Sequence, residues 1–172
     1  MPVTPPPLVD PEVAAATLRQ HVDELWATGR PDQKGWQLTW IDSLHLIVKM
    51  PAHRKDGTVD PYHLLLGGEY YDSGPPTVSF IEPETKQRTG KSSKWFPKID
   101  PRPPWFGLHD AYQFPGLGPR QLVCFTGTAE YYMTDHSPKE TERWTQGEHT
   151  IAMTLNRLQE VLSQPYYVAP HP

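Results

Sequence analysis

Cysteine is almost absent from this chain of 172 residues, which contains only one, Cys124. A single cysteine excludes an intrachain disulfide and any metal site built from several cysteines. Eight histidines are present, yet none has a His-x-x-x-His partner at the spacing of metal ligands. We therefore predict no metal. Because Gly-x-Gly-x-x-Gly and Walker patterns are also missing, we predict no cofactor or nucleotide site.

An excess of basic residues and long apolar runs are also missing. The formal net charge is −4 and the pI is near 6.0, which argues against a nucleic-acid partner. No apolar run approaches the roughly 20 residues that cross a bilayer, so no membrane contact is expected. The N-terminal ten residues lack the apolar core of a signal peptide, and we expect a cytoplasmic protein.

Proline, in contrast, is abundant, with 21 residues gathered at the chain ends and in a few loops. Proline removes a backbone donor and fixes φ, so these clusters mark tails and rigid loops. Hydrophobic residues make up 37% of the chain and charged residues 21%, which is typical of one globular domain. We predict a flexible tail at residues 1–9, a domain at 10–165 and a C-terminal tail at 166–172.

Two helices are predicted, one near each end of the domain. Asp10 followed by Pro11 supplies an N-cap acceptor and a proline at the first helical position, which predicts a helix over 11–28. A second helix is predicted over 150–163 and ends at Pro165. In both segments apolar residues recur at helical spacing, namely Leu18, Val22 and Leu25, then Ile151, Leu155, Leu158 and Leu162.

Four segments between these helices alternate apolar and polar residues, as half-buried strands do. They are 36–40, 44–48, 62–66 and 77–80. Strands that follow one another without helices between them favour an antiparallel meander. Residues 81–121 and 126–149 are expected to be long irregular loops on either side of the apolar segment around Cys124. The order predicts an α+β fold with helices packed on one antiparallel sheet.

Several motifs stand in a recognisable order around Cys124. The segment 64–80 contains a Gly-Gly-Glu-Tyr-Tyr turn and the paired prolines Pro75 and Pro76 between two strands. Phe114-Pro115-Gly116 lies ten residues before the cysteine, and Trp144 precedes the Thr-Ile that opens the last helix. Together these motifs resemble the ubiquitin-conjugating enzymes, over about residues 11–165. The trimmed ending and expanded loops are similar to the prokaryotic members of that superfamily.

The resemblance implies a UBC-like fold and a transferase activity. Cys124 would accept a ubiquitin-like protein as a thioester and pass it to a nucleophile on a target protein. The implied partners are a separate, ATP-dependent activating enzyme, the ubiquitin-like protein itself and an unknown target. The first helix would be the docking face for the activating enzyme. Trp144, Pro75 and Pro76 would support the active-site loops.

The motif before the cysteine departs from the family's His-Pro-Asn. Phe114 replaces the histidine and Gly116 replaces the asparagine, while Pro115 is retained. We expect backbone N–H groups near Gly116–Gly118 to replace the missing amide as oxyanion donors. As acid or base, His136 with Asp135 is one candidate and His109-Asp110 is another, because a histidine titrates near neutral pH.

Two other interpretations stay open. The first is a catalytically weak or inactive UBC-like module that binds or scaffolds ubiquitin-like proteins, and the missing histidine and asparagine favour it. The second is an unrelated α+β domain in which Cys124 is a core residue. An accessible thiol would indicate catalysis, and a fully buried one would indicate a binding module.

Overall fold

In the computed structural model, which describes residues 6–172, helix α1 (Pro11–Ala27) begins as the sequence predicts. The Asp10 carboxylate accepts hydrogen bonds from the backbone N–H groups of Glu12 and Val13. A short helix, α2 (Arg30–Gln33), follows at the left-handed Gly29. Residues 1–5 of the expected N-terminal tail lie outside the described part of the chain.

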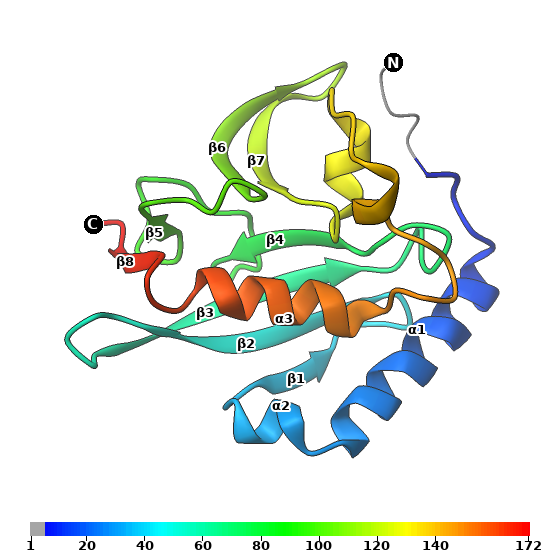
Figure 1. The fold of residues 1–172 in the computed structure, drawn as a ribbon, viewed down its shortest axis with the longest axis horizontal. Coiled ribbons are helices and arrows are strands. Elements are labelled where there is room, and N and C mark those ends of the chain that lie inside the picture. Colours follow the sequence, from blue (N-terminus) through cyan, green and yellow to red (C-terminus); the bar gives the residue numbers. More distant parts are fainter. Residues whose placement is uncertain (1–5) are drawn as a thin grey trace.

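The predicted antiparallel meander is confirmed. Its strands are β1 (Gln37–Trp40), β2 (His45–His53), β3 (Val59–Gly67) and β4 (Thr77–Ile81), and they pair in that order. One face of this sheet is buried against α3 (Ile151–Val161), which lies across it (Figure 1). Facing side chains from sheet and helix form the core, among them Leu46, Val48, Leu64, Leu66, Phe80, Leu155 and Leu158.

Tyr71, in the connection between β3 and β4, ties the two long helices together. Its buried hydroxyl accepts a hydrogen bond from the backbone N–H of Ile151 at 2.9 Å and contacts His21 Nδ1 at 2.7 Å. Thr150 caps α3, because its side chain accepts a hydrogen bond from the Ala152 N–H. The start of α3 is therefore fixed to α1 by one side chain.

The expectation of a long irregular loop at 81–121 is wrong. Residues 107–124 form a hairpin of β6 (Gly107–Phe114) and β7 (Gly118–Cys124), which rises beside β4 in Figure 1. A register shift between His109 and Tyr112 interrupts the alternation of β6, so its sequence lacks a clear period of two. Gly118 and Pro119, which open β7, are residues that seldom indicate a strand, so they also hid the hairpin in the sequence.

The prediction of a C-terminal tail at 166–172 is also wrong. β8 (Tyr167–Pro170) pairs with β5 (Pro97–Ile99) in a separate two-stranded sheet. The Tyr167 hydroxyl donates to Asp60 at 2.7 Å and meets the Tyr62 hydroxyl at 2.8 Å. This buried ring fastens the C-terminal segment to β3, although the proline-rich sequence resembles a tail.

The outer edge of β4 is covered partly by an isolated backbone bridge between Ile81 and Arg88 and partly by side chains. The amide of Gln121, in β7, accepts from the Phe80 N–H at 2.7 Å and donates to the carbonyls of Phe80 and Thr89. An amide side chain thus satisfies the backbone groups that a neighbouring strand would pair. It also joins the hairpin that ends in Cys124 to the sheet.

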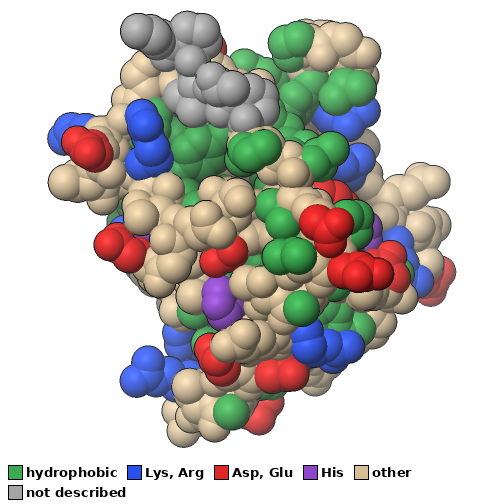
Figure 2. All heavy atoms as spheres, turned by 90° about the vertical axis from the view of Figure 1, so that its right-hand side faces the viewer, with side chains coloured by type: hydrophobic (Ala, Val, Ile, Leu, Met, Phe, Trp, Pro, Cys, Tyr) green, Lys and Arg blue, Asp and Glu red, His purple; other side chains and the backbone are tan. Residues whose placement is uncertain are grey.

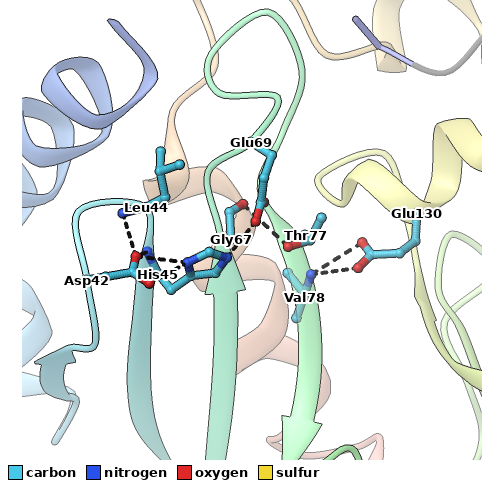
Figure 3. Close-up of polar contacts among 8 residues, drawn as sticks. All are labelled: Asp42, Leu44, His45, Gly67, Glu69, Thr77, Val78 and Glu130. Atoms are coloured by element: carbon cyan, nitrogen blue, oxygen red, sulfur yellow. Dashed lines mark hydrogen bonds and ion pairs between the residues drawn. The ribbon is translucent and has the colours of Figure 1, made fainter. Parts of the chain in front are cut away.

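A cluster of charged residues lies at the end of the sheet where β2 begins and β3 ends (Figure 3). His45 contacts Asp42 at 2.8 Å and Glu69 at 2.5 Å. Burial alone lowers the pKa of His45, but the hydrogen bonds and charges of Asp42 and Glu69 raise it above its ordinary value. The imidazole therefore links the β1–β2 turn to the connection after β3.

The face on the α1 side carries charged side chains of both signs among hydrophobic ones (Figure 2). The exposed charged residues of α1 are Glu12, Arg19, Asp23 and Glu24. Within residues 6–172, no helix has the length and apolar character that crossing a membrane requires.

Candidate functional site

Cys124 is the last residue of β7 and lies directly opposite Gly107 of β6. Only 5% of its surface is exposed, because it belongs to a small buried cluster with Phe114 and Leu122, against which Tyr131 packs. Gly107 has no side chain, so the space beside the thiol is left open on the β6 side. The cysteine is thus neither freely accessible nor part of the main core.

His136 is the polar partner of the thiol. Its Nε2 lies 3.4 Å from Cys124 Sγ, and its Nδ1 lies 3.2 Å from the carbonyl oxygen of Tyr131. A carbonyl oxygen only accepts hydrogen bonds, so Nδ1 carries the ring proton in the neutral tautomer. Nε2 is then unprotonated and directs its lone pair at the sulfur, which makes it an acceptor for the thiol proton.

Two further contacts orient the His136 ring. Tyr131 stacks on it with ring centroids 4.2 Å apart and planes inclined by 25°. The Thr134 hydroxyl lies 2.8 Å from Nδ1. Thr134 is buried. The histidine is therefore held on three sides before any substrate arrives, as a preorganised base requires.

The short 3₁₀ helix η1 (Ala129–Met133) carries Tyr131 and is anchored on β4. Figure 3 shows the Glu130 carboxylate pointing at the start of β4, where it accepts from the Val78 N–H at 2.9 Å. The Ala129 N–H donates to the carbonyl of Pro76 at 2.9 Å. The second of the paired prolines therefore positions the first residue of η1.

Trp144 also supports the segment that contains η1. Its backbone N–H donates to the Tyr132 hydroxyl at 2.8 Å, and its indole N–H donates to the Asp72 carbonyl at 2.9 Å. The ring is buried. The short 3₁₀ helix η2 (Glu140–Glu142) lies between this tryptophan and His136 in the chain. Trp144 thus braces the loop that presents the histidine.

Burial sets the ionisation of two groups at this site. It raises the pKa of the Cys124 thiol to about 11, so the sulfur is protonated at neutral pH. Although Glu130 as a residue is partly exposed, its carboxyl group is enclosed, and this raises its pKa to about 8. The protonated thiol has an imidazole nitrogen 3.4 Å from its sulfur, which places a proton acceptor within reach during nucleophilic attack.

A pocket of about 650 Å³ opens beside the pair. Its walls come from β6, β7, the η1–η2 segment and α3, and they include Cys124, His136 and His109. Asp135 is exposed and also lines it. Of the second candidate pair, only His109 lies here, because Asp110 turns toward Lys91, 4.0 Å away. The volume lies within the range of pockets that bind small ligands.

None of Phe114, Pro115 and Gly116 lines this pocket, although Phe114 belongs to the same small buried cluster as Cys124. Pro115 and Gly116 form the turn of the hairpin, and Phe114 pairs with Gly118, whereas Cys124 pairs with Gly107 at the opposite end. The expectation that N–H groups of Gly116–Gly118 serve as oxyanion donors is therefore wrong. The ten residues between Phe114 and Cys124 run through the hairpin turn and along the extended strand β7, and they do not form a compact loop.

Sequence reasoning selected Cys124, His136 and His109 but missed the residues that orient them. Tyr131, Thr134 and Gly107 carried no motif, although the spacing Thr-x-His with a tyrosine five residues earlier is a local signal. Among residues 6–172, no group of three or more His, Cys, Asp or Glu is placed to hold a metal ion.

Comparisons with known proteins add no relative: no protein-family model matches this chain, and no curated protein matches it. The function is therefore argued from the geometry of the site.

Proposed function

We propose that this protein is a transferase that carries an acyl group as a thioester on Cys124. The observation that carries the proposal is the contact of 3.4 Å between His136 Nε2 and Cys124 Sγ on the wall of a pocket. A buried, protonated thiol needs such an acceptor in order to attack a carbonyl carbon.

The loading step is an exchange between two sulfurs. The Cys124 sulfur forms a bond to the carbonyl carbon of an incoming thioester while its proton moves to His136 Nε2. The bond to the donor's sulfur then breaks, and the departing thiolate takes the proton from His136. Atoms and charges balance, and no oxidant or metal is required.

The acyl group we propose is the C-terminus of a ubiquitin-like protein, delivered by a separate ATP-dependent activating enzyme and passed to a nucleophile on a target. The order of helix, four-stranded meander, cysteine and helix supports this choice, as do Pro76 and Trp144, which both brace η1. The charged α1 face would receive the activating enzyme.

Loading can be tested with a glycine-terminated peptide thioester and intact-protein mass measurement. We expect an adduct on Cys124 that thiol reductants remove. Cys124→Ser should not form this reductant-sensitive adduct. His136→Gln should slow loading about 100-fold, since a general base contributes on that order. His63→Gln, on β3 away from the pocket, is the matched control. An equal rate in His136→Gln would contradict the assignment.

A second candidate function is a non-catalytic module that binds ubiquitin-like proteins. The specific observation in its favour is that Cys124 is only 5% exposed. In that case no thioester would form with the activating enzyme, ATP and the ubiquitin-like protein, and Cys124→Ser would bind the ubiquitin-like protein as tightly as the wild type.

A further inference from the structure

The pocket beside Cys124 holds a second histidine on the strand opposite to it. His109 pairs with Leu122 in the register of the hairpin, two residues from the Gly107–Cys124 pair, so all four positions share one face. His109 is exposed. Tyr112 packs against its ring, with centroids 5.5 Å apart. The ring therefore has a wall on one side and solvent on another.

Gly107 leaves room between this ring and Cys124. A Cβ atom built on Gly107 would lie 3.4 Å from Cys124 Cβ and 3.7 Å from His109 Nε2. The missing side chain thus creates one small space that both the cysteine and His109 Nε2 border. A nucleophile that occupied it would meet the acyl carbon on Cys124 and the imidazole nitrogen at once.

We propose that His109 is the catalytic residue that takes the proton from the incoming nucleophile, while His136 serves the thiol. This inference rests on the proposed thioester function and assigns its second half-reaction. A nitrogen of the acceptor bonds to the acyl carbon, and its proton passes to His109. The carbon–sulfur bond breaks, Cys124 leaves as a thiolate and regains a proton from solvent through His136, and His109 releases the proton it accepted to solvent.

The charges around His109 suit a base. Burial lowers the pKa of His109, and the nearby cations Arg102 and Lys91 lower it further, against the opposing effect of Asp110. His136 lines the same pocket, and its charge also lowers the pKa of His109. The other ionisable groups on the pocket walls are Tyr112, Tyr131, Asp135, Glu142, His149 and Arg157. An unprotonated imidazole at neutral pH is able to accept a proton.

The test separates loading from discharge. Cys124 is first loaded with the glycine-terminated peptide thioester, and free thioester is removed. Lysine is then added between pH 5 and 9, and amide formation is followed by mass. Dividing the wild-type rate by the His109→Gln rate at each pH cancels the ionisation of lysine itself. His63→Gln is the matched control, because burial lowers its pKa as well.

We expect His109→Gln to load at the wild-type rate and to discharge at least tenfold more slowly at pH 8. The ratio should rise from near one at acidic pH to a plateau, with a midpoint below about 6.5, the ordinary imidazole value. A ratio of one at every pH, an equal loss in His63→Gln, or an equal loss in loading would overturn the role of His109. If the wild type fails to load, the proposed function fails, and the role of His109 falls with it.

Discussion

At the scale of single residues, the site depends on the conflict between burial and reactivity at Cys124. Burial holds the thiol in its protonated form, and the Nε2 lone pair of His136 offers the proton a destination only when a carbonyl is attacked. Such a cysteine is protected from random alkylation and oxidation, because the thiolate is scarce at rest.

The first prediction concerns this protonated resting state. Iodoacetamide should alkylate native Cys124 at pH 8 roughly 100-fold more slowly than the same cysteine in urea-unfolded chain, whose pKa is about 8.5. Because the native pKa is raised to about 11, the rate should keep increasing with pH up to that value. Mass measurement of the alkylated fraction over time tests this. A native midpoint near 8.5 would contradict it.

At the scale of elements, β4 connects the catalytic segment to the rest of the fold. Gln121 of β7 and Glu130 of η1 both bond to backbone groups on its outer edge. The position of the cysteine strand and the position of the histidine loop are therefore set by the same strand. A change at this edge is expected to affect stability and reactivity together.

Gln121→Ala should lower the free energy of unfolding by about 2–4 kcal/mol. The substitution leaves the Phe80 N–H and the Thr89 carbonyl without the partner that Gln121 supplies, and each unsatisfied buried group is costly. The Phe80 carbonyl keeps its hydrogen bonds from Thr89. Urea unfolding followed by tryptophan fluorescence measures the loss. The exposed Gln87→Ala is the control and should change stability by less than about 0.5 kcal/mol. Equal midpoints for the two variants would refute the bracing role.

Glu130→Gln should make the protein more stable than the wild type at alkaline pH. Burial raises the pKa of Glu130 from 4.5 to about 8, so its contribution is fully present below 4.5 and is lost as pH rises through about 8. The glutamine variant keeps a neutral acceptor for the Val78 N–H throughout. We expect the two proteins to diverge by a few kcal/mol between pH 5 and 9.

Urea unfolding at a series of pH values gives this comparison. The exposed Glu148→Gln is the control, and its curve should run parallel to that of the wild type. A wild-type stability that rises relative to Glu130→Gln above pH 8 would show that the carboxylate is stabilised in the folded state.

At the scale of the whole molecule, segments far apart in the sequence close around one core. The C-terminal strand β8 meets β5 and places Tyr167 against Tyr62, while α3 spans the sheet between α1 and the hairpin. The last residues therefore belong to the folded unit and contribute to the surroundings of β3.

Truncation after Pro165 should lower the free energy of unfolding by at least about 3 kcal/mol, since it removes a fully buried aromatic ring. Tyr167→Phe keeps the ring and loses only the hydroxyl contacts to Tyr62 and Asp60, so about 1–2 kcal/mol is expected. Thermal or urea unfolding ranks the three proteins. A truncated chain with the wild-type midpoint would restore the tail interpretation.

Local signals predicted some parts of this fold well and failed where pairing partners lie far apart. The Asp10-Pro11 start of α1 and the alternation of β2 and β3 depend on neighbours in sequence, and the structure confirms both. The hairpin β6–β7 has a bulge, and β8 is short and rich in proline, so their pairing had no local pattern.

The candidate site likewise has residues that the sequence predicted and residues that only the structure identified. Residue type alone selected Cys124, His136 and His109, because thiols and imidazoles carry nucleophilic and proton-transfer chemistry. The spacing of Phe114–Gly116 from the cysteine was misleading, since ten residues fold into a hairpin arm and separate the two. Only coordinates distinguish a compact loop from an extended strand of equal length.

The sequence by itself determined the α+β class, the four-stranded meander, the two long helices and the identity of the one available nucleophile. Those features follow from local periodicity, capping and composition. The tertiary structure decided that the cysteine is nearly buried, that His136 rather than the upstream motif meets its sulfur, and that His109 borders the same space. These contacts join residues on separate strands and loops, and their distances depend on how the whole chain packs.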